Sequence, residues 1–150
     1  GSSCFKDPRF CYSLAIWHQL LSFEEQHHAR YVCVFREPSA VAASTQAELV
    51  AAPYLKGLAL SNDDLEANWL ALYGHVLKHK MNLGQWLFVS YESLLKPDGL
   101  GLQRLERFTG MPVDRTFVTP RLHRQRGSGV ISAACQQLYA ELLELSDSTP

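Results

Sequence analysis

The sequence predicts an α/β domain of three layers, with helices packed around a small parallel sheet. Two short apolar runs, Tyr31–Phe35 and Trp86–Val89, are rich in β-branched and aromatic residues, which is typical of strands buried on both faces. Residues at helical spacing separate the two runs, and a helical crossover is the usual connection between parallel strands. The 150 residues are 47% hydrophobic and 19% charged, which suits one globular domain with its own core.

The N-terminal residues predict the end of a strand followed by a helix. Cys4–Arg9 has the pattern of a strand that Pro8 breaks, because proline cannot donate a ladder hydrogen bond. Apolar residues then recur at helical spacing, so we expect an amphipathic helix over about 11 to 25, with Trp17 in the core. Together with the strand Tyr31–Phe35, these elements would form a βαβ unit.

The middle of the chain predicts two helices between the strands. Pro38 follows the first strand and suits the first turn of a helix that continues past Ser44. The stretch Ala51–Leu60 contains proline and glycine and is expected to be irregular. Ser61 and the acids after it are a strong helix start, and this helix should run to about Lys80. Its apolar face consists of residues at helical spacing: Leu65, Trp69, Leu72 and Val76.

The C-terminal third predicts two further helices around a basic loop. A short helical turn is expected over residues 92–95, and a longer helix should end at Gly110. Arg121–Gly129 is basic and contains glycine, which is typical of a surface loop. The last helix is indicated by apolar residues that step by three and four: Ile131, Cys135, Leu138, Leu142 and Leu145.

Composition argues against several classes of protein. The net charge is −1 and the pI is near 6.6, so the sequence does not support nucleic-acid binding through bulk charge. No apolar run approaches the ~18 residues of a membrane span, so we expect no membrane partner. The four cysteines form no CxxC pair, and Cys33 and Cys135 are expected to be buried thiols. We therefore predict a reducing compartment and a cytoplasmic location.

The junction between the first strand and the next helix contains the candidate anion site. Arg36 ends the strand, and Ser44 lies about two turns into the helix. Ligands of open α/β sheets bind outside the carboxyl ends of the strands, where helix N-termini favour anions. Arg36 and Ser44 are therefore candidates to bind one phosphate. The alternative is an arginine in a structural ion pair and a serine on a helix surface.

Several stretches, taken together, resemble the sulfotransferases that use 3′-phosphoadenosine-5′-phosphosulfate (PAPS), in particular their bacterial carbohydrate-type branch. The matching segments, in the family's order, are Lys6-Asp7-Pro8-Arg9-Phe10, Phe35-Arg36-Glu37-Pro38 with Val41 and Ser44, Val89–Leu95, Phe108–Pro112 and, more weakly, Arg126-Gly127-Ser128-Gly129. The resemblance implies one sulfotransferase-like domain over residues 1–150, with a sheet of the P-loop nucleotide-binding type. It also implies sulfonate transfer from PAPS to a hydroxyl group, with adenosine 3′,5′-bisphosphate as the product. The acceptor would be a carbohydrate or another small molecule.

The resemblance also suggests roles for individual residues. Arg36 and Ser44 would bind the 3′-phosphate of PAPS, and Tyr91 would lie near the adenine. The alternative for Tyr91 is a buried phenol whose hydroxyl binds a neighbouring backbone group. Arg126, with the adjacent Gly127, would close over the phosphates; the alternative is a solvated basic loop.

Lys6 and Asp7 are the candidate catalytic residues, because we expect their strand end to lie beside the strand of Arg36. Asp7 would be the base for the acceptor, and Lys6 would stabilise the leaving group. The alternative is that Asp7 and Arg9 form a pair that fixes the turn at Pro8. We predict no metal site: His75 and His79 are four residues apart, but no third ligand accompanies them.

One departure from the family concerns its phosphosulfate loop, a glycine-rich turn between a first strand and a first helix. No such stretch occurs in this sequence, so we expect a sulfotransferase-like domain that is incomplete at its N-terminus, with Gly1–Ser3 as a candidate expression scar. A non-catalytic nucleotide-binding or interaction module derived from the family is the alternative function. A sheet edge left uncovered would favour self-association into a homo-oligomer.

Overall fold

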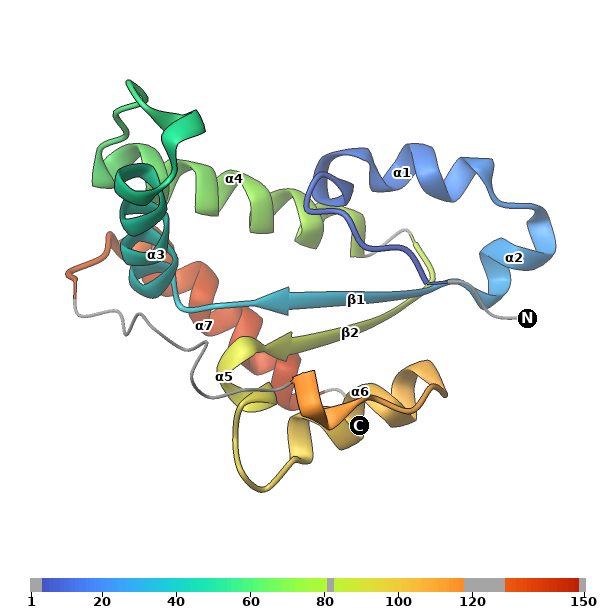
Figure 1. The fold of residues 1–150 in the computed structure, drawn as a ribbon. Helices are drawn as coiled ribbons and strands as arrows, with labels where there is room; N and C mark the ends of the chain where they lie inside the picture. The colour runs from blue at the N-terminus through green and yellow to red at the C-terminus, as the bar shows by residue number, and fades with distance from the viewer. Residues whose placement is uncertain (1–3, 81–82, 118–128, 149–150) are drawn as a thin grey trace.

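Two parallel strands form the centre of the fold in the computed structural model, which describes residues 4–80, 83–117 and 129–148 (Figure 1). Strand β1 (Arg30–Phe35) pairs with β2 (Gln85–Ser90) in a register that runs from Arg30↔Gln85 to Phe35↔Ser90. The two predicted strands and their parallel pairing are thus confirmed. Because the last residues of the strands are partners, the chain leaves both strands at the same edge of the sheet.

Helices lie on both sides of this sheet, so the chain has a mixed α/β architecture. In Figure 1, α1 (Phe10–Leu20) and α4 (Asn62–Lys80) lie on one side, and α6 (Leu100–Thr109) lies on the other. Helix α7 (Ala133–Ser148) contacts both β2 and α4. The crossover from β1 to β2 consists of α3 (Pro38–Ala51), a short 3₁₀ turn and α4.

The helix ends follow from the residues that the sequence places there. Pro38 occupies the first turn of α3, where its missing N–H costs no hydrogen bond. Ser61 precedes α4 and exchanges hydrogen bonds with Asp64 at distances of 2.6 to 3.1 Å. Gly110 ends α6 with a φ of 69°, a left-handed conformation that glycine adopts without steric cost.

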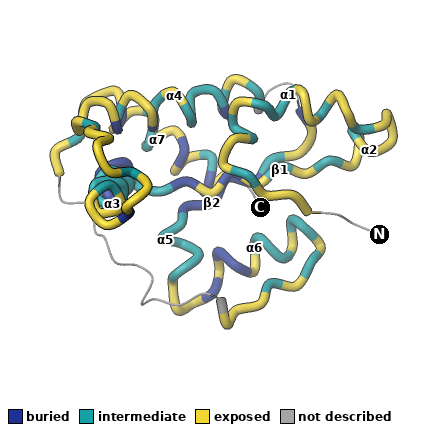
Figure 2. The backbone as a smooth tube through the Cα atoms, turned by 45° about the horizontal axis from the view of Figure 1, so that its top comes forward, coloured by how far each residue is buried: buried dark blue, intermediate teal, exposed yellow. Residues whose placement is uncertain are grey.

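The main core lies where β1 and β2 meet α4 and α7. Figure 2 shows buried segments concentrated there. Its buried side chains are Cys33, Phe35, Trp69, Val76, Phe88, Cys135 and Leu142. The predicted burial of Trp69 and of both thiols is therefore confirmed, and the apolar faces of α4 and α7 meet at this core.

The two strands differ in how completely they are buried. Leu87 and Val89 of β2 are fully buried, and α6 packs against this strand. The corresponding outward-facing residues of β1, Val32 and Val34, remain 37% and 46% exposed. The expectation that β1 is buried on both faces is thus wrong, because the helix on that side extends over its neighbour instead.

The N-terminal expectations are also wrong in part. Residues 4–7 adopt no regular structure and Pro8 and Arg9 form a turn, so residues 4–9 contain no strand and the expected βαβ unit is not formed there. The expected single helix is divided into α1 and α2 (Phe23–His28), because Ser22 caps α2 in a capping box with Glu25. Trp17 is 47% exposed and lies outside the core.

Candidate functional site

The carboxyl edge of the sheet brings together Arg36 and Tyr91, two of the predicted nucleotide-binding residues. Because Phe35 pairs with Ser90, the next residues of the two strands emerge beside each other. The Cζ atom of Arg36 lies 5.1 Å from the centre of the Tyr91 ring, which is within the range of a cation–π contact. We call Arg36, Glu37, Tyr91 and Glu92 the strand-end site.

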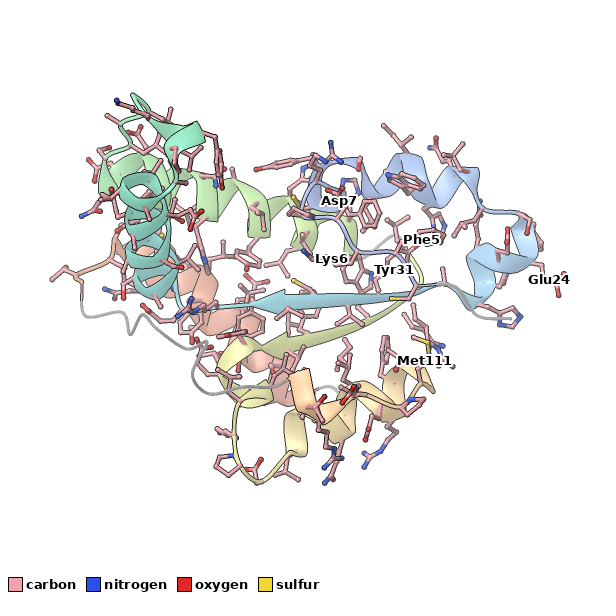
Figure 3. All side chains as sticks on the ribbon, viewed as in Figure 1. Phe5, Lys6, Asp7, Glu24, Tyr31 and Met111 are labelled. Carbon is pink, nitrogen blue, oxygen red and sulfur yellow. The ribbon has the colours of Figure 1, made fainter. Side chains whose placement is uncertain are left out.

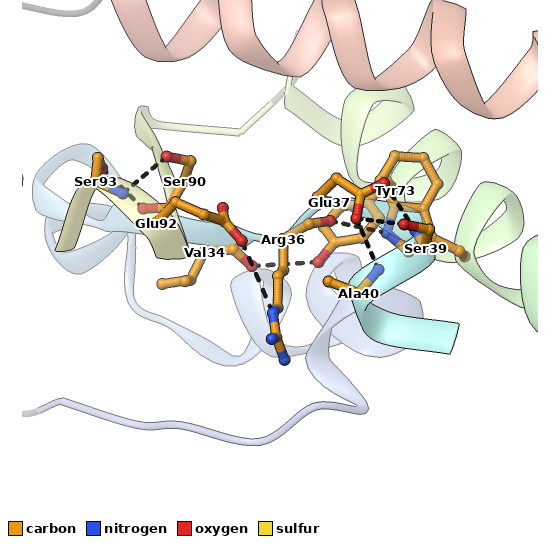
Figure 4. A network of polar contacts seen from close by, with 10 residues as sticks. Val34, Arg36, Glu37, Ser39, Ala40, Tyr73, Ser90, Glu92 and Ser93 are labelled. Atoms are coloured by element: carbon orange, nitrogen blue, oxygen red, sulfur yellow. Dashed lines mark hydrogen bonds and ion pairs between the residues drawn. The ribbon is translucent and has the colours of Figure 1, made fainter. Parts of the chain in front are cut away.

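Glu92 is the acidic member of this site that faces Arg36. Its Oε1 atom lies 3.8 Å from Nε of Arg36, and both side chains are partly buried. The other carboxylate oxygen of Glu92, Oε2, is buried without a hydrogen bond to any residue that the structure describes. Figure 4 shows the Arg36 side chain extended, with its guanidinium pointing away from Ser39 and Ala40. Arg36 therefore forms a long ion pair with Glu92, at 3.8 Å, which agrees with the alternative interpretation of Arg36 as a member of a structural ion pair.

The N-terminus of α3 is capped by the chain's own carboxylate. Glu37 accepts hydrogen bonds from the backbone N–H groups of Ser39 at 3.0 Å and Ala40 at 2.7 Å. It also accepts one from the Ser39 hydroxyl at 2.7 Å. These amides would otherwise attract an external anion, so Glu37 occupies the position at which a helix N-terminus favours negative charge. Gly129 lies beside Ser39, where a Cβ atom would stand 3.7 Å from the Ser39 Cβ.

Ser44 lies on α3 and is half-buried. It lies seven positions after the N-cap residue Glu37, which is close to two helical turns, so it lies on the side of α3 that is nearest to Glu37. Ser44 makes no side-chain hydrogen bond within the described part of the chain, whereas its neighbour Thr45 donates to the Val41 carbonyl at 3.0 Å. The joint binding of one phosphate by Arg36 and Ser44 stays a prediction.

Lys6 and Asp7 lie in the segment that runs alongside β1 towards α1, as Figure 3 shows. The strand on which they were expected does not exist, so the reason for placing them next to Arg36 is lost. Asp7 accepts three hydrogen bonds from Arg9, two from the guanidinium at 2.9 and 2.7 Å and one from the backbone at 2.8 Å. These bonds lower the pKa of the Asp7 carboxyl to about 2, which makes it a weak base. These contacts agree with the alternative interpretation, in which Asp7 and Arg9 form a pair that fixes the turn at Pro8.

Two side chains of α4 hold the end of β1 in place through hydrogen bonds to its backbone. The Trp69 indole donates to the Arg36 carbonyl at 3.2 Å, and the Tyr73 hydroxyl donates to the Val34 carbonyl at 3.4 Å. Burial raises the pKa of the Tyr73 phenol. The pKa of the Tyr139 phenol is raised to about 12, mainly by burial and to a smaller extent by the negative charges of Glu92 and Glu37. Sequence analysis missed these contacts, because helical spacing identifies Trp69 only as an apolar core residue.

Other expectations concern Arg126, Gly127 and the two histidines of α4. Arg126 and Gly127 lie outside the described residues. The Nε2 atoms of His75 and His79 are 3.1 Å apart, the distance of a hydrogen bond between the rings. Over residues 4–80, 83–117 and 129–148, no group of three or more potential ligands could hold a metal ion. In the same ranges no helix is both long enough and apolar enough to cross a membrane.

Comparisons with protein families, with curated proteins and with solved structures found no match to this chain.

Proposed function

We propose that this protein transfers a sulfonate group from PAPS to a hydroxyl group of a carbohydrate or another small molecule. The observation that carries the proposal is the register of β1 and β2. It brings Cζ of Arg36 to 5.1 Å from the centre of the Tyr91 ring at one edge of the sheet. A guanidinium suits a phosphate, and an aromatic ring beside it suits a nucleobase. The proposal includes a sheet of the P-loop nucleotide-binding type and a cytoplasmic location.

The charge around Arg36 sets a requirement for this function. The strand-end site has one guanidinium and two carboxylates, Glu37 and Glu92. A nucleotide with several phosphates needs more positive charge than this to bind well. In the proposal, Arg126 and the adjacent Gly127 supply contacts to the phosphates, and Ser44 completes the 3′-phosphate site.

Binding without transfer is the second candidate function, and the contacts of Asp7 favour it. Its carboxylate is held by Arg9, and its pKa of about 2 makes proton removal from an acceptor inefficient. A non-catalytic nucleotide-binding module needs no such base. In the catalytic alternative, Asp7 acts as the base and Lys6 stabilises the leaving group only after the pair with Arg9 is broken.

Calorimetry with adenosine 3′,5′-bisphosphate tests the nucleotide site. We expect the bisphosphate to bind more tightly than adenosine 5′-monophosphate, since only the former has the 3′-phosphate that Arg36 recognises. Arg36→Ala should remove this preference and weaken bisphosphate binding by about tenfold or more. Arg107→Ala, which removes an exposed arginine of α6, is the matched control and should change neither affinity.

Transfer from radiolabelled PAPS then separates the two candidate functions. Labelled product from a mixture of sugars and small alcohols would support the transferase, provided that Asp7→Asn abolishes it. Binding of the bisphosphate without labelled product would support the non-catalytic module. Failure of the unmodified chain to bind the bisphosphate would reject both.

A further inference from the structure

Helices α3 and α4 form a second candidate site, a partly open pocket of about 400 Å³, next to the strand-end site. Val41 and Thr45 contribute to it from α3, and Leu60 contributes from the segment between the helices. Its volume lies in the range of pockets that hold small organic ligands. We call it the α3–α4 pocket.

The aromatic wall of this pocket is held in place by hydrogen bonds. Tyr73 lines the pocket with a partly buried ring, and Trp69, which is only 3% exposed, supports that ring from the core, with the ring centres 4.7 Å apart. Their polar atoms donate to the carbonyls of Arg36 and Val34, so each ring is tied to the end of β1. Gln46 of α3 donates to the Leu60 carbonyl at 2.8 Å, which ties the segment before α4 to α3. The pocket is therefore formed before a ligand arrives, which reduces the entropic cost of binding.

The polar residues of the pocket define the chemistry of a ligand. Asp64 lines it, and hydrogen bonds from Ser61 lower the pKa of its carboxyl, so it carries a negative charge at neutral pH. Asn68 also lines it, and its amide makes no side-chain hydrogen bond to another residue that the structure describes. A negatively charged ligand would be repelled by Asp64, whereas a hydroxyl group can both donate and accept at the Asn68 amide.

We propose that the α3–α4 pocket binds an uncharged ring compound that carries a hydroxyl group. The ring would pack against the partly buried side chains of Leu72 and Tyr73, and the hydroxyl would bind Asn68. The pocket shares none of its lining residues with the strand-end site, so this assignment stands even if the nucleotide proposal fails. It adds a site for a neutral compound beside a site for an anion.

Equilibrium dialysis with 2-naphthol, an uncharged aromatic alcohol at neutral pH, tests the assignment. We expect saturable binding of one molecule per chain. Asn68→Phe fills the pocket and should weaken binding by about tenfold or more. Ala67→Phe adds the same ring at the neighbouring exposed position of α4, outside the pocket, and should leave the affinity unchanged. Circular dichroism verifies that both variants are folded.

Three outcomes would overturn the proposal. The first is an absence of saturable binding to the unmodified chain. The second is an equal loss of affinity in Asn68→Phe and Ala67→Phe, both folded. The third is displacement of 2-naphthol by naphthalene-2-sulfonate at equal concentration, because the negative charge of Asp64 should weaken binding of the sulfonate. If Asn68→Phe does not fold, Asn68→Leu replaces it, with Ala67→Leu as its control and a loss of about fivefold expected from one hydrogen bond.

Discussion

Helices α1 and α7 are both rich in apolar residues, yet only α7 buries them. Cys135 and Leu142 of α7 are fully buried against β2 and α4. Helix α1 contains no Asp, Glu, Lys or Arg, but none of its side chains is buried, and Leu20 remains 72% exposed. Helical spacing thus indicates that a helix has an apolar face. It does not indicate whether another element covers that face.

The largest difference is expected from matched leucine truncations. Leu142→Ala removes a fully buried side chain and should lower the free energy of unfolding by about 3 kcal/mol through lost burial and a cavity. Leu20→Ala should change it by less than about 0.5 kcal/mol. Urea titrations followed by circular dichroism measure both. An equally large effect of Leu20→Ala would mean that α1 is covered in solution, as in the predicted homo-oligomer.

The two strands offer the same comparison within the sheet. Val89→Ala in β2 should cost about 2 kcal/mol, because the side chain is fully buried. Val34→Ala in β1 should cost less than about 1 kcal/mol, because its side chain is partly in water. The same urea titrations apply. Equal costs would contradict the one-sided burial of β1.

A smaller effect is expected at the N-terminus of α3. Glu37→Ala removes the carboxylate that accepts from Ser39 and Ala40 and should destabilise the protein by about 1 kcal/mol. Glu24→Ala removes an exposed acid from the first turn of α2 and is the control for lost charge alone. In thermal unfolding, the melting temperature of Glu37→Ala should be clearly lower than that of Glu24→Ala. Equal melting temperatures would argue that the cap contributes only its charge.

The smallest effect concerns the pair of Asp7 and Arg9 in the N-terminal segment. The folded-state pKa of Asp7 is lowered from 3.8 to about 2, so the pair stabilises the fold fully above pH 3.8. That stabilisation is lost as the pH falls through about 2. In Arg9→Gln, the pKa of Asp7 should return towards its usual value. An NMR titration of the Asp7 carboxyl carbon measures the shift, and an unchanged pKa would refute the pairing.

The strand-end site was predictable only in part. The position of Arg36 after an apolar run makes it a candidate, whereas Tyr91 is a candidate through the resemblance to the sulfotransferases. Their proximity follows from the parallel pairing of the strands. Glu37 carried a usable signal, since an acid directly before a helix proline is a plausible cap. The approach of Glu92 and the hydrogen bond from Trp69 to Arg36 join residues far apart in the chain. No local pattern reports such contacts.

The sequence by itself determined the local elements of this protein. Pro38 begins α3, Ser61 and Asp64 begin α4, and Gly110 ends α6, because each signal acts through neighbouring backbone groups. Only the tertiary structure decided which apolar faces are covered. In the part of the chain that the structure describes, residues 4–7 resemble a strand but pair with neither β1 nor β2, and no element covers Trp17, which stays 47% exposed. Burial depends on surfaces contributed by distant parts of the chain, so the same local pattern can end in the core or in water.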